Sequence, residues 1–299
     1  MFQKPAFALI EERYSCRSFD GKPIPAEKLQ SLRDFVEALD AGPFATRARF
    51  GLVAAEAHDS TLLKGLSTYG FIKQASAFLV GAGGRTEDDL VDFGYLTELA
   101  VLKATELGLG SCWIGGTFRR SRFAAAVGLD PRLDEGDGPK TIICVIALGN
   151  FPSDSNPREG FIRIRAGGAF RKAPEALFFG DAWSEPLSLP SPRIATEILD
   201  AVRLAPSASN KQPWRLVVPA GSTSANPKVH LYLQRTPGYH GIVPRLAKVA
   251  DIQVVDMGIA LAHMALVASE MGLPASIVRR NPSLSINDPL VKYIATLNG

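Results

Sequence analysis

Two arginines flank a serine at alternating positions near the start of the chain, in the segment Arg13-Tyr14-Ser15-Cys16-Arg17. In an extended segment, side chains two residues apart point to the same side, so Arg13, Ser15 and Arg17 would face one ligand together. A guanidinium binds phosphate through paired hydrogen bonds, and a hydroxyl adds a further donor. The pattern suits a phosphate monoester, but taken alone it favours a solvated basic turn.

A second segment concentrates short polar donors between two prolines and a tryptophan. Its sequence is Ala205-Pro206-Ser207-Ala208-Ser209-Asn210-Lys211-Gln212-Pro213-Trp214. A loop that only ends a helix would also contain turn-forming residues. Such a loop requires neither so many donors nor an adjoining tryptophan, so we interpret the segment as part of a binding site.

The residue types do not support several other kinds of site. The four histidines, His58, His230, His240 and His263, are isolated and lack the spacing of metal ligands. We therefore predict no metal site, and we expect His263 to be a hydrogen-bonded residue of the core. The Gly108-Leu109-Gly110 segment ends a predicted helix and precedes a strand, which is the reverse of the order in a dinucleotide fingerprint.

The composition narrows the class of protein. The 299 residues carry a formal net charge of +3, with 46% hydrophobic and 21% charged residues. The basic stretch 158–172 is too short for a nucleic-acid arm, so we expect no nucleic-acid partner. The longest apolar run, residues 142–148, is far shorter than a membrane span, and residues 1–12 do not have the pattern of a signal peptide. Three cysteines without Cys-x-x-Cys spacing fit a reducing cytoplasm, so we expect a cytoplasmic protein away from membranes.

Helices and strands are predicted in a mixed order without a regular βαβ repeat. Helical spacing of apolar residues predicts helices at residues 25–39, 88–107, 121–127, 193–204 and 254–271. Short apolar runs predict strands at residues 51–55, 77–80, 111–115, 141–148, 215–219, 228–233, 275–278 and 291–297. Residues 151–192 form a proline-rich connector that is too long to be an idle loop. This mixture is typical of an α+β fold.

The chain contains an internal repeat. Residues 91–114 align with residues 255–278 without a gap, and eight of the aligned positions are identical. The identical pairs are Val91/Val255, Asp92/Asp256, Gly94/Gly258, Leu102/Leu266, Ala104/Ala268, Glu106/Glu270, Gly108/Gly272 and Leu109/Leu273. Average residue usage would give about one or two identities by chance. Duplication of a long unit suggests a two-fold homodimer fused into one chain, because each copy would carry the same interface.

The two copies differ in the segments where chemistry is predicted. The polar segment 205–214 aligns with residues 41–50, which lack its serines, asparagine and glutamine. Conversely, Ile114-Gly115-Gly116 aligns with Val278-Arg279-Arg280, which lacks the glycine pair. The second copy also has no Arg-x-Ser-x-Arg pattern before its first helix. A site shared across the pseudo-two-fold axis would therefore be complete once, and its symmetry mate would be degenerate.

Together these segments resemble the signature sequences of the FMN-dependent nitroreductase family. The resemblance rests on residues 13–17, 110–115 and 206–214, and it is closest to the internally duplicated branch of that family. Members are normally homodimers that bind two FMN molecules at the interface, each held by both subunits. The resemblance therefore implies a nitroreductase-like fold in which two tandem diverged copies form a single-chain pseudo-dimer. Its halves would be residues 1–150 and 193–299, and the connector 151–192 would wrap between them in one intertwined globular unit.

The resemblance also implies which residues bind the cofactor. They are Arg13, Ser15, Arg17, Ile114, Gly115, Gly116, Arg171, Pro206, Ser207 and Asn210. Arg13 and Ser15 would hold the FMN phosphate, with Arg171 as a later basic contact. Arg17 would lie near the pyrimidine edge of the ring, where a cation stabilises the anionic reduced flavin.

The remaining implied contacts come from both copies. The backbone of residues 114–116 would pass beside the flavin ring, because glycine permits a close approach. The polar loop of the second half, beginning at Pro206, would bond the ring edge and the ribityl chain through Ser207 and Asn210.

The activity implied by the resemblance is that of an FMN-dependent oxidoreductase. NAD(P)H would reduce the flavin at N5 and leave, and an electron-poor acceptor such as a nitroaromatic or quinone would follow. No side chain needs to act as an acid or base, so we assign no catalytic residue. Specialised flavin chemistry on the same fold, such as dehalogenation or flavin cleavage, and a non-catalytic flavin-binding protein are alternatives. Since the family's dimer interface would lie inside one chain, we expect a monomer with one FMN.

Overall fold

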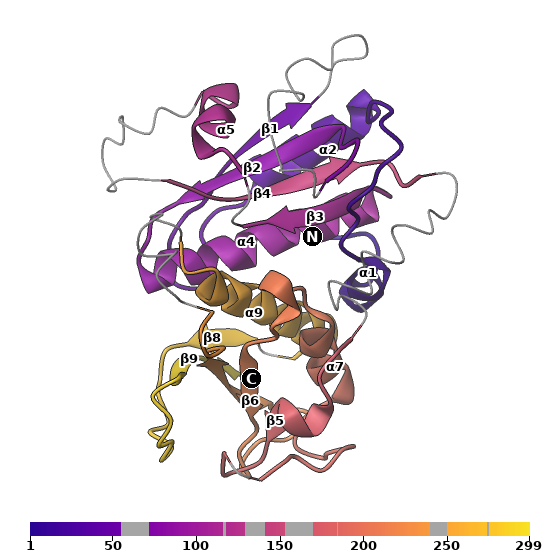
Figure 1. The fold of residues 1–299 in the computed structure, drawn as a ribbon. Coiled ribbons are helices and arrows are strands. Elements are labelled where there is room, and N and C mark those ends of the chain that lie inside the picture. The colour runs from indigo at the N-terminus through magenta and orange to yellow at the C-terminus, as the bar shows by residue number, and fades with distance from the viewer. Residues whose placement is uncertain are drawn as a thin grey trace.

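Two sheets and the helices between them form the part of the protein that the structure describes. The computed structural model describes residues 1–54, 72–115, 118–128, 141–152, 170–183, 185–239, 250–273 and 275–299. Two long helices lie between the sheets, one belonging to each half of the chain (Figure 1). The mixture of helices and mainly antiparallel strands confirms the α+β class.

The first sheet is built from residues of the first half. It contains β1 (Arg49–Ala54), β2 (Ala77–Gly83), β3 (Gly110–Ile114) and β4 (Thr141–Gly149). The strand order is β1-β2-β4-β3, and every neighbouring pair is antiparallel. β2 is buried along its whole length and β4 along nearly all of it, because both strands are central and covered on two faces.

The second sheet repeats this order and adds one strand. It contains β5 (Phe178–Phe179), β6 (Trp214–Val217), β7 (Lys228–Gln234), β8 (Ser276–Val278) and β9 (Val291–Asn298). The order is β5-β6-β7-β9-β8, in which the last four strands pair antiparallel in the same order as the first sheet. β5 belongs to the connector and pairs parallel with β6, so the connector extends the second sheet.

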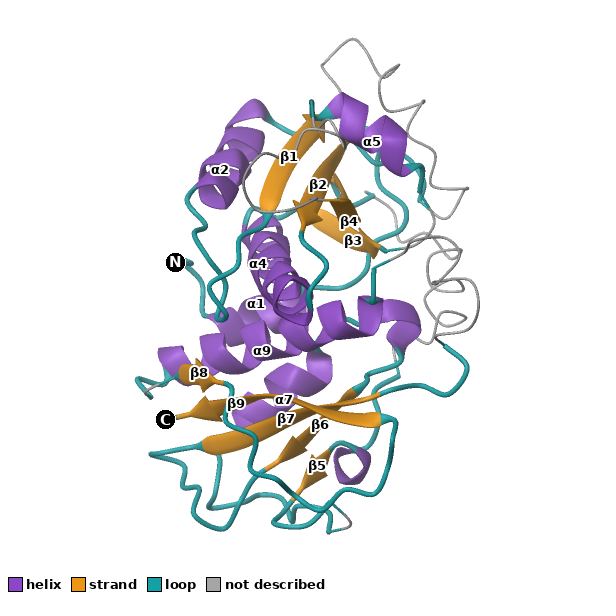
Figure 2. Ribbon diagram, turned by 90° about the vertical axis from the view of Figure 1, so that its left-hand side faces the viewer, coloured by secondary structure: helices purple, strands orange, loops and turns teal. Residues whose placement is uncertain are grey.

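The helices surround and separate the two sheets. They are α1 (Ala6–Glu12), α2 (Ala26–Glu37), α4 (Glu87–Glu106), α5 (Arg120–Ala126), α7 (Thr196–Leu204) and α9 (Ile252–Glu270), with short 3-10 turns η1 (Pro174–Ala176) and η2 (Ala208–Asn210). Figure 2 shows α4 and α9 side by side between the sheets, where they pack against each other. α2 contacts α4 and β1, whereas α1 contacts α4, α9 and α7.

Two glycines allow the backbones of α4 and α9 to touch. A Cβ added at Gly94 would overlap the carbonyl oxygen of Val255, and one at Gly258 would overlap the carbonyl oxygen of Val91. Gly94 and Gly258 are aligned positions of the repeat, and so are Val91 and Val255. Each helix therefore presents the same residues to the other, which is the geometry of an isologous interface.

Both long helices end with the same glycine cap. Gly108 and Gly272 each have a φ of +71°, a left-handed conformation that glycine adopts without steric cost. The N–H of Leu109 donates to the carbonyl oxygen of Ala104 at 2.9 Å, and the N–H of Leu273 donates to that of Ala268 at 3.0 Å. The predicted helix ends at these glycines are confirmed.

The hydrophobicity of α9 follows from its place in the core. By length and composition it is the one described helix that could cross a membrane, with a mean hydropathy of 1.6. However, 83% of this apolar stretch of α9 is buried inside the protein, where the helix packs against α4, α7 and the second sheet. A helix that is apolar on all sides is expected in the centre of a layered protein.

Two helices differ from the sequence prediction by more than two residues. α1 is not among the predicted helices, although Ala6 and Leu9 on its buried face have helical spacing. α7 begins at Thr196, later than the predicted start at residue 193. Arg193 lies outside the helix, with its guanidinium hydrogen-bonded to the carboxylate of Asp181 at 3.0 Å.

Replacing Gly94 with alanine is expected to destabilise the protein by about 1–3 kcal/mol, because the new methyl meets backbone that cannot rotate away. Gly221→Ala is the control, since a Cβ there meets nothing within 4 Å. Urea unfolding of both variants measures the difference. Equal free energies of unfolding for the two variants would contradict the backbone contact between α4 and α9.

Candidate functional site

The Arg-x-Ser-x-Arg segment leaves α1 and runs beside β3. The N–H of Cys16 donates to the carbonyl oxygen of Ser111 at 2.8 Å, and Ser15 pairs with Ser111 in a parallel bridge. Cys16 is buried, whereas Ser15 and Arg17 are half-buried, as expected where alternate side chains face opposite sides. The segment is therefore attached to the strand that leads to the predicted glycine pair.

Arg13 lies deeper in the protein than the rest of this segment. Its side chain is 4% exposed, and its Nε lies 3.9 Å from the fully buried carboxylate of Glu98. Glu98 also accepts from the indole N–H of Trp113 at 2.9 Å and lies 3.0 Å from Nε2 of His263. The Nδ1 of His263 is 2.8 Å from the carbonyl oxygen of Ala201, so the expected hydrogen-bonded core histidine is confirmed. The role of Arg13 in binding phosphate stays a prediction.

The polar loop has an unusual backbone. Ser209, Asn210 and Gln212 have φ angles of +50°, +52° and +48°. A left-handed conformation costs a non-glycine residue roughly 1–3 kcal/mol, and such residues gather at functional sites. The hydroxyl of Ser207 holds the loop by accepting the N–H of Gln212 at 2.9 Å.

Arg171, which lies in the connector, forms a hydrogen bond to the polar loop. Its guanidinium donates to the side-chain oxygen of Asn210 at 3.0 Å. The amide of Asn210 in turn donates to the carbonyl oxygen of Phe170 at 2.8 Å, and the N–H of Lys172 donates to Oε1 of Gln212 at the same distance. Two of the predicted site residues, Arg171 and Asn210, are therefore in direct contact.

The first turns of α9 bring the two halves of the predicted site together. Gly115, at the end of β3, faces Ile252, whose Cδ1 would lie 3.2 Å from an added Cβ. One turn later, the carboxylate of Asp256 accepts the N–H of Ala208 at 3.0 Å. Residues four apart lie on the same side of a helix. Gly115 of the first half and the polar loop of the second half therefore lie at adjacent turns of α9. Gly116 lies outside the described residues.

Arg120 on α5 holds the backbone at Gly115 in place. Its guanidinium donates to the carbonyl oxygen of Gly115 at 3.3 Å and to that of Ile142 at 3.2 Å. Burial lowers the pKa of Arg120. The sequence does not point to Arg120, because no local pattern relates it to the turn that it holds.

Further cations surround the polar loop. The ammonium of Lys172 lies 3.4 Å from the carbonyl oxygen of Gln212, and the guanidinium of Arg215 donates to the same oxygen at 3.1 Å. Burial and then the charges of Arg215 and Lys211 lower the pKa of Lys172 to about 8. Burial also lowers the pKa of Arg215 to about 10. Such a cluster favours a bound anion, because a negative charge relieves the repulsion among the cations.

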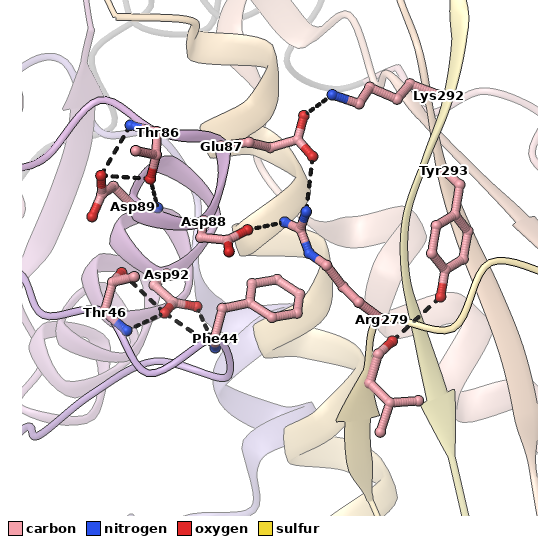
Figure 3. Close-up of polar contacts among 11 residues, drawn as sticks. Phe44, Thr46, Thr86, Glu87, Asp88, Asp89, Asp92, Arg279, Lys292 and Tyr293 are labelled. Atoms are coloured by element: carbon pink, nitrogen blue, oxygen red, sulfur yellow. Dashed lines mark hydrogen bonds and ion pairs between the residues drawn. The ribbon is translucent and has the colours of Figure 1, made fainter.

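The alignment of the two copies gives a second position, equivalent to this site, at Arg279 and Phe44. Side chains fill this second position. Arg279, which aligns with Gly115, forms ion pairs with Glu87, at 3.1 Å, and with Asp88 at the start of α4 (Figure 3). Its guanidinium also lies 4.3 Å from the centre of the Phe44 ring. A stacked and doubly paired guanidinium therefore occupies the position that aligns with Gly115, which has no side chain.

The loop at this second position is anchored in the same way as the polar loop. The carboxylate of Asp92 accepts the N–H of Phe44 at 3.0 Å and the N–H of Thr46 at 2.8 Å (Figure 3). Phe44 aligns with Ala208, and Asp92 aligns with Asp256. Burial raises the pKa of both carboxyl groups. The identical aspartates of the repeat were thus a signal in the sequence for these two anchors.

A comparison with protein families decides the family. The family model described as "Putative TM nitroreductase" matches residues 6–268. The chain belongs to this family. A structure titled as a putative nitroreductase from Thermotoga maritima is 20% identical, with a TM-score of 0.56, and covers 99% of this chain and 94% of its own. This likeness shows that the chain has the nitroreductase fold.

Other nitroreductase structures are similar to parts of the chain. A nitroreductase family protein from Clostridium difficile 630 is 19% identical with a TM-score of 0.39, and covers 64% of this chain and 99% of its own. A nitroreductase with bound FMN from Bacteroides fragilis is 22% identical with a TM-score of 0.38, and covers 52% of this chain and 92% of its own. No curated protein matches the chain.

Asp256→Asn is expected to be at least as stable as the wild type at pH 7. Burial raises the pKa of Asp256 well above its ordinary 3.8, so the folded protein keeps a proton that the unfolded chain releases. Stability therefore falls as the pH rises above the unfolded pKa. Asparagine keeps an oxygen that can accept from Ala208 and does not ionise, so this decline should shrink.

Urea unfolding of both proteins between about pH 4.5 and 7 measures the effect. Asp92→Asn is the contrast, because hydrogen bonds from Phe44 and Thr46 favour the charged form of Asp92 and oppose the rise of its pKa, so this substitution should reduce the decline less. A steeper decline with pH for Asp256→Asn than for the wild type would contradict a protonated Asp256.

Proposed function

We propose that the protein is an FMN-dependent oxidoreductase of the nitroreductase type, with NAD(P)H as its reductant. The observation that carries the proposal is the meeting of two distant segments at the first turns of α9. There Gly115 faces Ile252 one turn before Asp256 anchors the polar loop. A flat ring with a phosphate tail requires backbone that it can approach, polar groups at its edge and cations for the phosphate.

The cations around the polar loop fit a phosphate group. Arg171 and Lys172 of the connector lie beside the loop, and Lys211 and Arg215 add positive charge. The lowered pKa of Lys172 supports this assignment, because a site that repels its own cations gains most from an anion. In the proposal, Arg13 and Ser15 complete the phosphate site from the N-terminal segment.

Each side chain of the proposed site binds or orients the cofactor. Bound FMN supplies hydride chemistry at N5, between NAD(P)H and an electron-poor acceptor such as a nitroaromatic or quinone. Ser207 and Asn210 would hydrogen-bond the ring edge and ribityl chain, and Arg17 would place a positive charge near the pyrimidine edge. Gly115 has no side chain, so its backbone could approach the ring closely. These residues position and tune the cofactor, and none transfers a proton.

The proposal includes a single FMN in a duplicated, fused chain. The repeated strand order, the reciprocal glycine contact and the paired aspartate anchors support duplication. The ion pairs and ring contact of Arg279 support one site, since they fill the symmetry-related position. The packing of α4 on α9 supports a monomer, because the family resemblance implies that such a contact replaces an interface between subunits. The buried free thiols of Cys16, Cys112 and Cys144 are consistent with a cytoplasmic protein.

The purified protein is expected to bind one FMN per chain as a monomer, and NADH or NADPH should bleach the flavin under anaerobic conditions. Absorbance gives the stoichiometry, and light scattering after gel filtration gives the mass. Two FMN per chain would contradict the closed second position. Bound flavin that neither nucleotide reduces would favour a non-catalytic flavin-binding protein, and a chain that binds no FMN would refute the proposal.

FMN affinity is expected to weaken roughly tenfold between pH 7 and 9, a typical contribution for one hydrogen bond to a charged group. The pKa of Lys172 is lowered to about 8, so its positive charge is present at pH 7 and lost as the pH rises through that value. The phosphate of FMN, with a second pKa of about 6, stays a dianion over this range.

Titrations of the cofactor-free protein with FMN at several pH values test this expectation. Lys172→Gln should bind FMN weakly already at pH 7 and show a flatter profile. Lys211→Gln should move the midpoint upward, because it removes one of the charges that lower the pKa of Lys172. A profile for Lys172→Gln that parallels the wild type would assign the pH dependence to another group.

A further inference from the structure

A buried polar network links the two central helices to three segments of the proposed site. Its centre is the carboxylate of Glu98 on α4 and the imidazole of His263 on α9, both fully buried and 3.0 Å apart. We propose that this pair positions the cofactor-binding segments relative to one another. The inference rests on the proposed FMN site and assigns Glu98 and His263 as positioning residues.

The hydrogen bonds of the network determine how many protons it holds. The carbonyl oxygen of Ala201 can only accept, so Nδ1 of His263 donates to it. Nε2 faces a carboxylate oxygen, so one proton must lie between His263 and Glu98. Whichever group carries this proton, the pair has no net charge. The oxygen that faces His263, Oε1 of Glu98, also lies 3.9 Å from Nε of Arg13, which limits the direction in which the guanidinium plane can lie.

Each arm of the network ends beside a segment of the proposed site. Arg13 begins the Arg-x-Ser-x-Arg segment, which is attached to β3. Trp113, which donates to Glu98 at 2.9 Å, directly precedes Ile114 and Gly115. Ala201 lies in α7, the helix that ends at the polar loop. Glu98 and His263 therefore hold three segments that are distant in sequence to one rigid pair of helices.

The repeat indicates that the fold itself does not require this network. Glu98 aligns with Ala262, and His263 aligns with Leu99. Ala262 and Leu99 are both buried in the core. Apolar residues therefore fill the related positions of the same helix pair. Buried ionisable groups cost desolvation energy, and apolar replacements of similar volume often leave stability unchanged or higher. Glu98 and His263 thus lie on the side of the proposed site, where they position three segments. Ala262 and Leu99 take their place on the side of the equivalent position, which Arg279 fills.

Amide hydrogen exchange of the cofactor-free protein tests the inference through two variants. Glu98→Gln keeps an acceptor for Trp113 and a donor for a neutral His263, but it replaces the acceptor oxygen opposite Nε of Arg13 with an amide NH2 group, which can only donate. Exchange should therefore become faster in residues 13–17, including the Cys16 amide that bonds to Ser111. His263→Leu, which introduces the residue of the aligned position, should loosen residues 201–212 instead.

The same variants are then titrated with FMN. Each is expected to weaken FMN binding roughly tenfold, the lower end of the effect of losing a supporting partner in metal sites. Asp92→Asn is the control, because Asp92 is a buried carboxylate of the same helix that anchors only the loop at Phe44 and Thr46. It should alter exchange in that loop and leave FMN affinity unchanged.

Uniformly faster exchange in Glu98→Gln, matched by a lower free energy of unfolding, would reduce the network to general stability and overturn the inference. Unchanged exchange and unchanged FMN affinity in both variants would also overturn it. The exchange measurements use the cofactor-free protein, so they test the network without depending on FMN binding. A wild-type protein that binds no FMN is a separate outcome and would refute the proposed function.

Discussion

The backbone contact between α4 and α9 is the constraint on which the rest of the structure depends. Gly94 and Gly258 remove the side chains that would separate the helices, so each helix meets a carbonyl oxygen of the other. This close approach carries the first turns of α9 to the end of β3, where Ile252 faces Gly115. A pair of helices held further apart by side chains would separate the two halves of the proposed site.

The two halves therefore share strand order and helix contacts but differ in the side chains at the proposed site and its equivalent position. The two sheets share one strand order, and the two helices share their glycine contact and their caps. At one of two aligned positions Gly115 has no side chain, whereas at the other Arg279 is paired with two carboxylates and stacked on Phe44. The difference comes from side chains at aligned positions, whereas four strands keep the same order in both sheets.

Buried carboxyl groups on the central helices hold the surrounding loops. Asp92 and Asp256 accept backbone N–H groups from aligned loops, and Glu98 connects Arg13 to the helix pair. A loop with three left-handed non-glycine residues persists only where such anchors fix it. The helices thus act as the rigid part to which irregular segments are bonded, and this explains how segments that are distant in sequence keep a defined geometry.

The sequence by itself determined the regular elements and the segments that carry chemistry. Apolar spacing predicts α4 and α9, Gly108 and Gly272 mark their ends, and the repeat pairs Asp92 with Asp256. These features are local, or they recur at a constant offset, so one chain displays them without knowledge of the fold. Short elements such as α1 and β5 escaped prediction because their patterns are too brief to stand out from chance.

Only the tertiary structure decided which side chains meet. The ion pair of Arg13 with Glu98, the contact of Gly115 with Ile252 and the support of Gly115 by Arg120 join residues on separate elements. Such contacts depend on the angle and distance at which whole helices and sheets pack, which no local spacing encodes. The physical reason is that secondary structure follows from neighbouring residues, whereas a shared site follows from the packing of all layers at once.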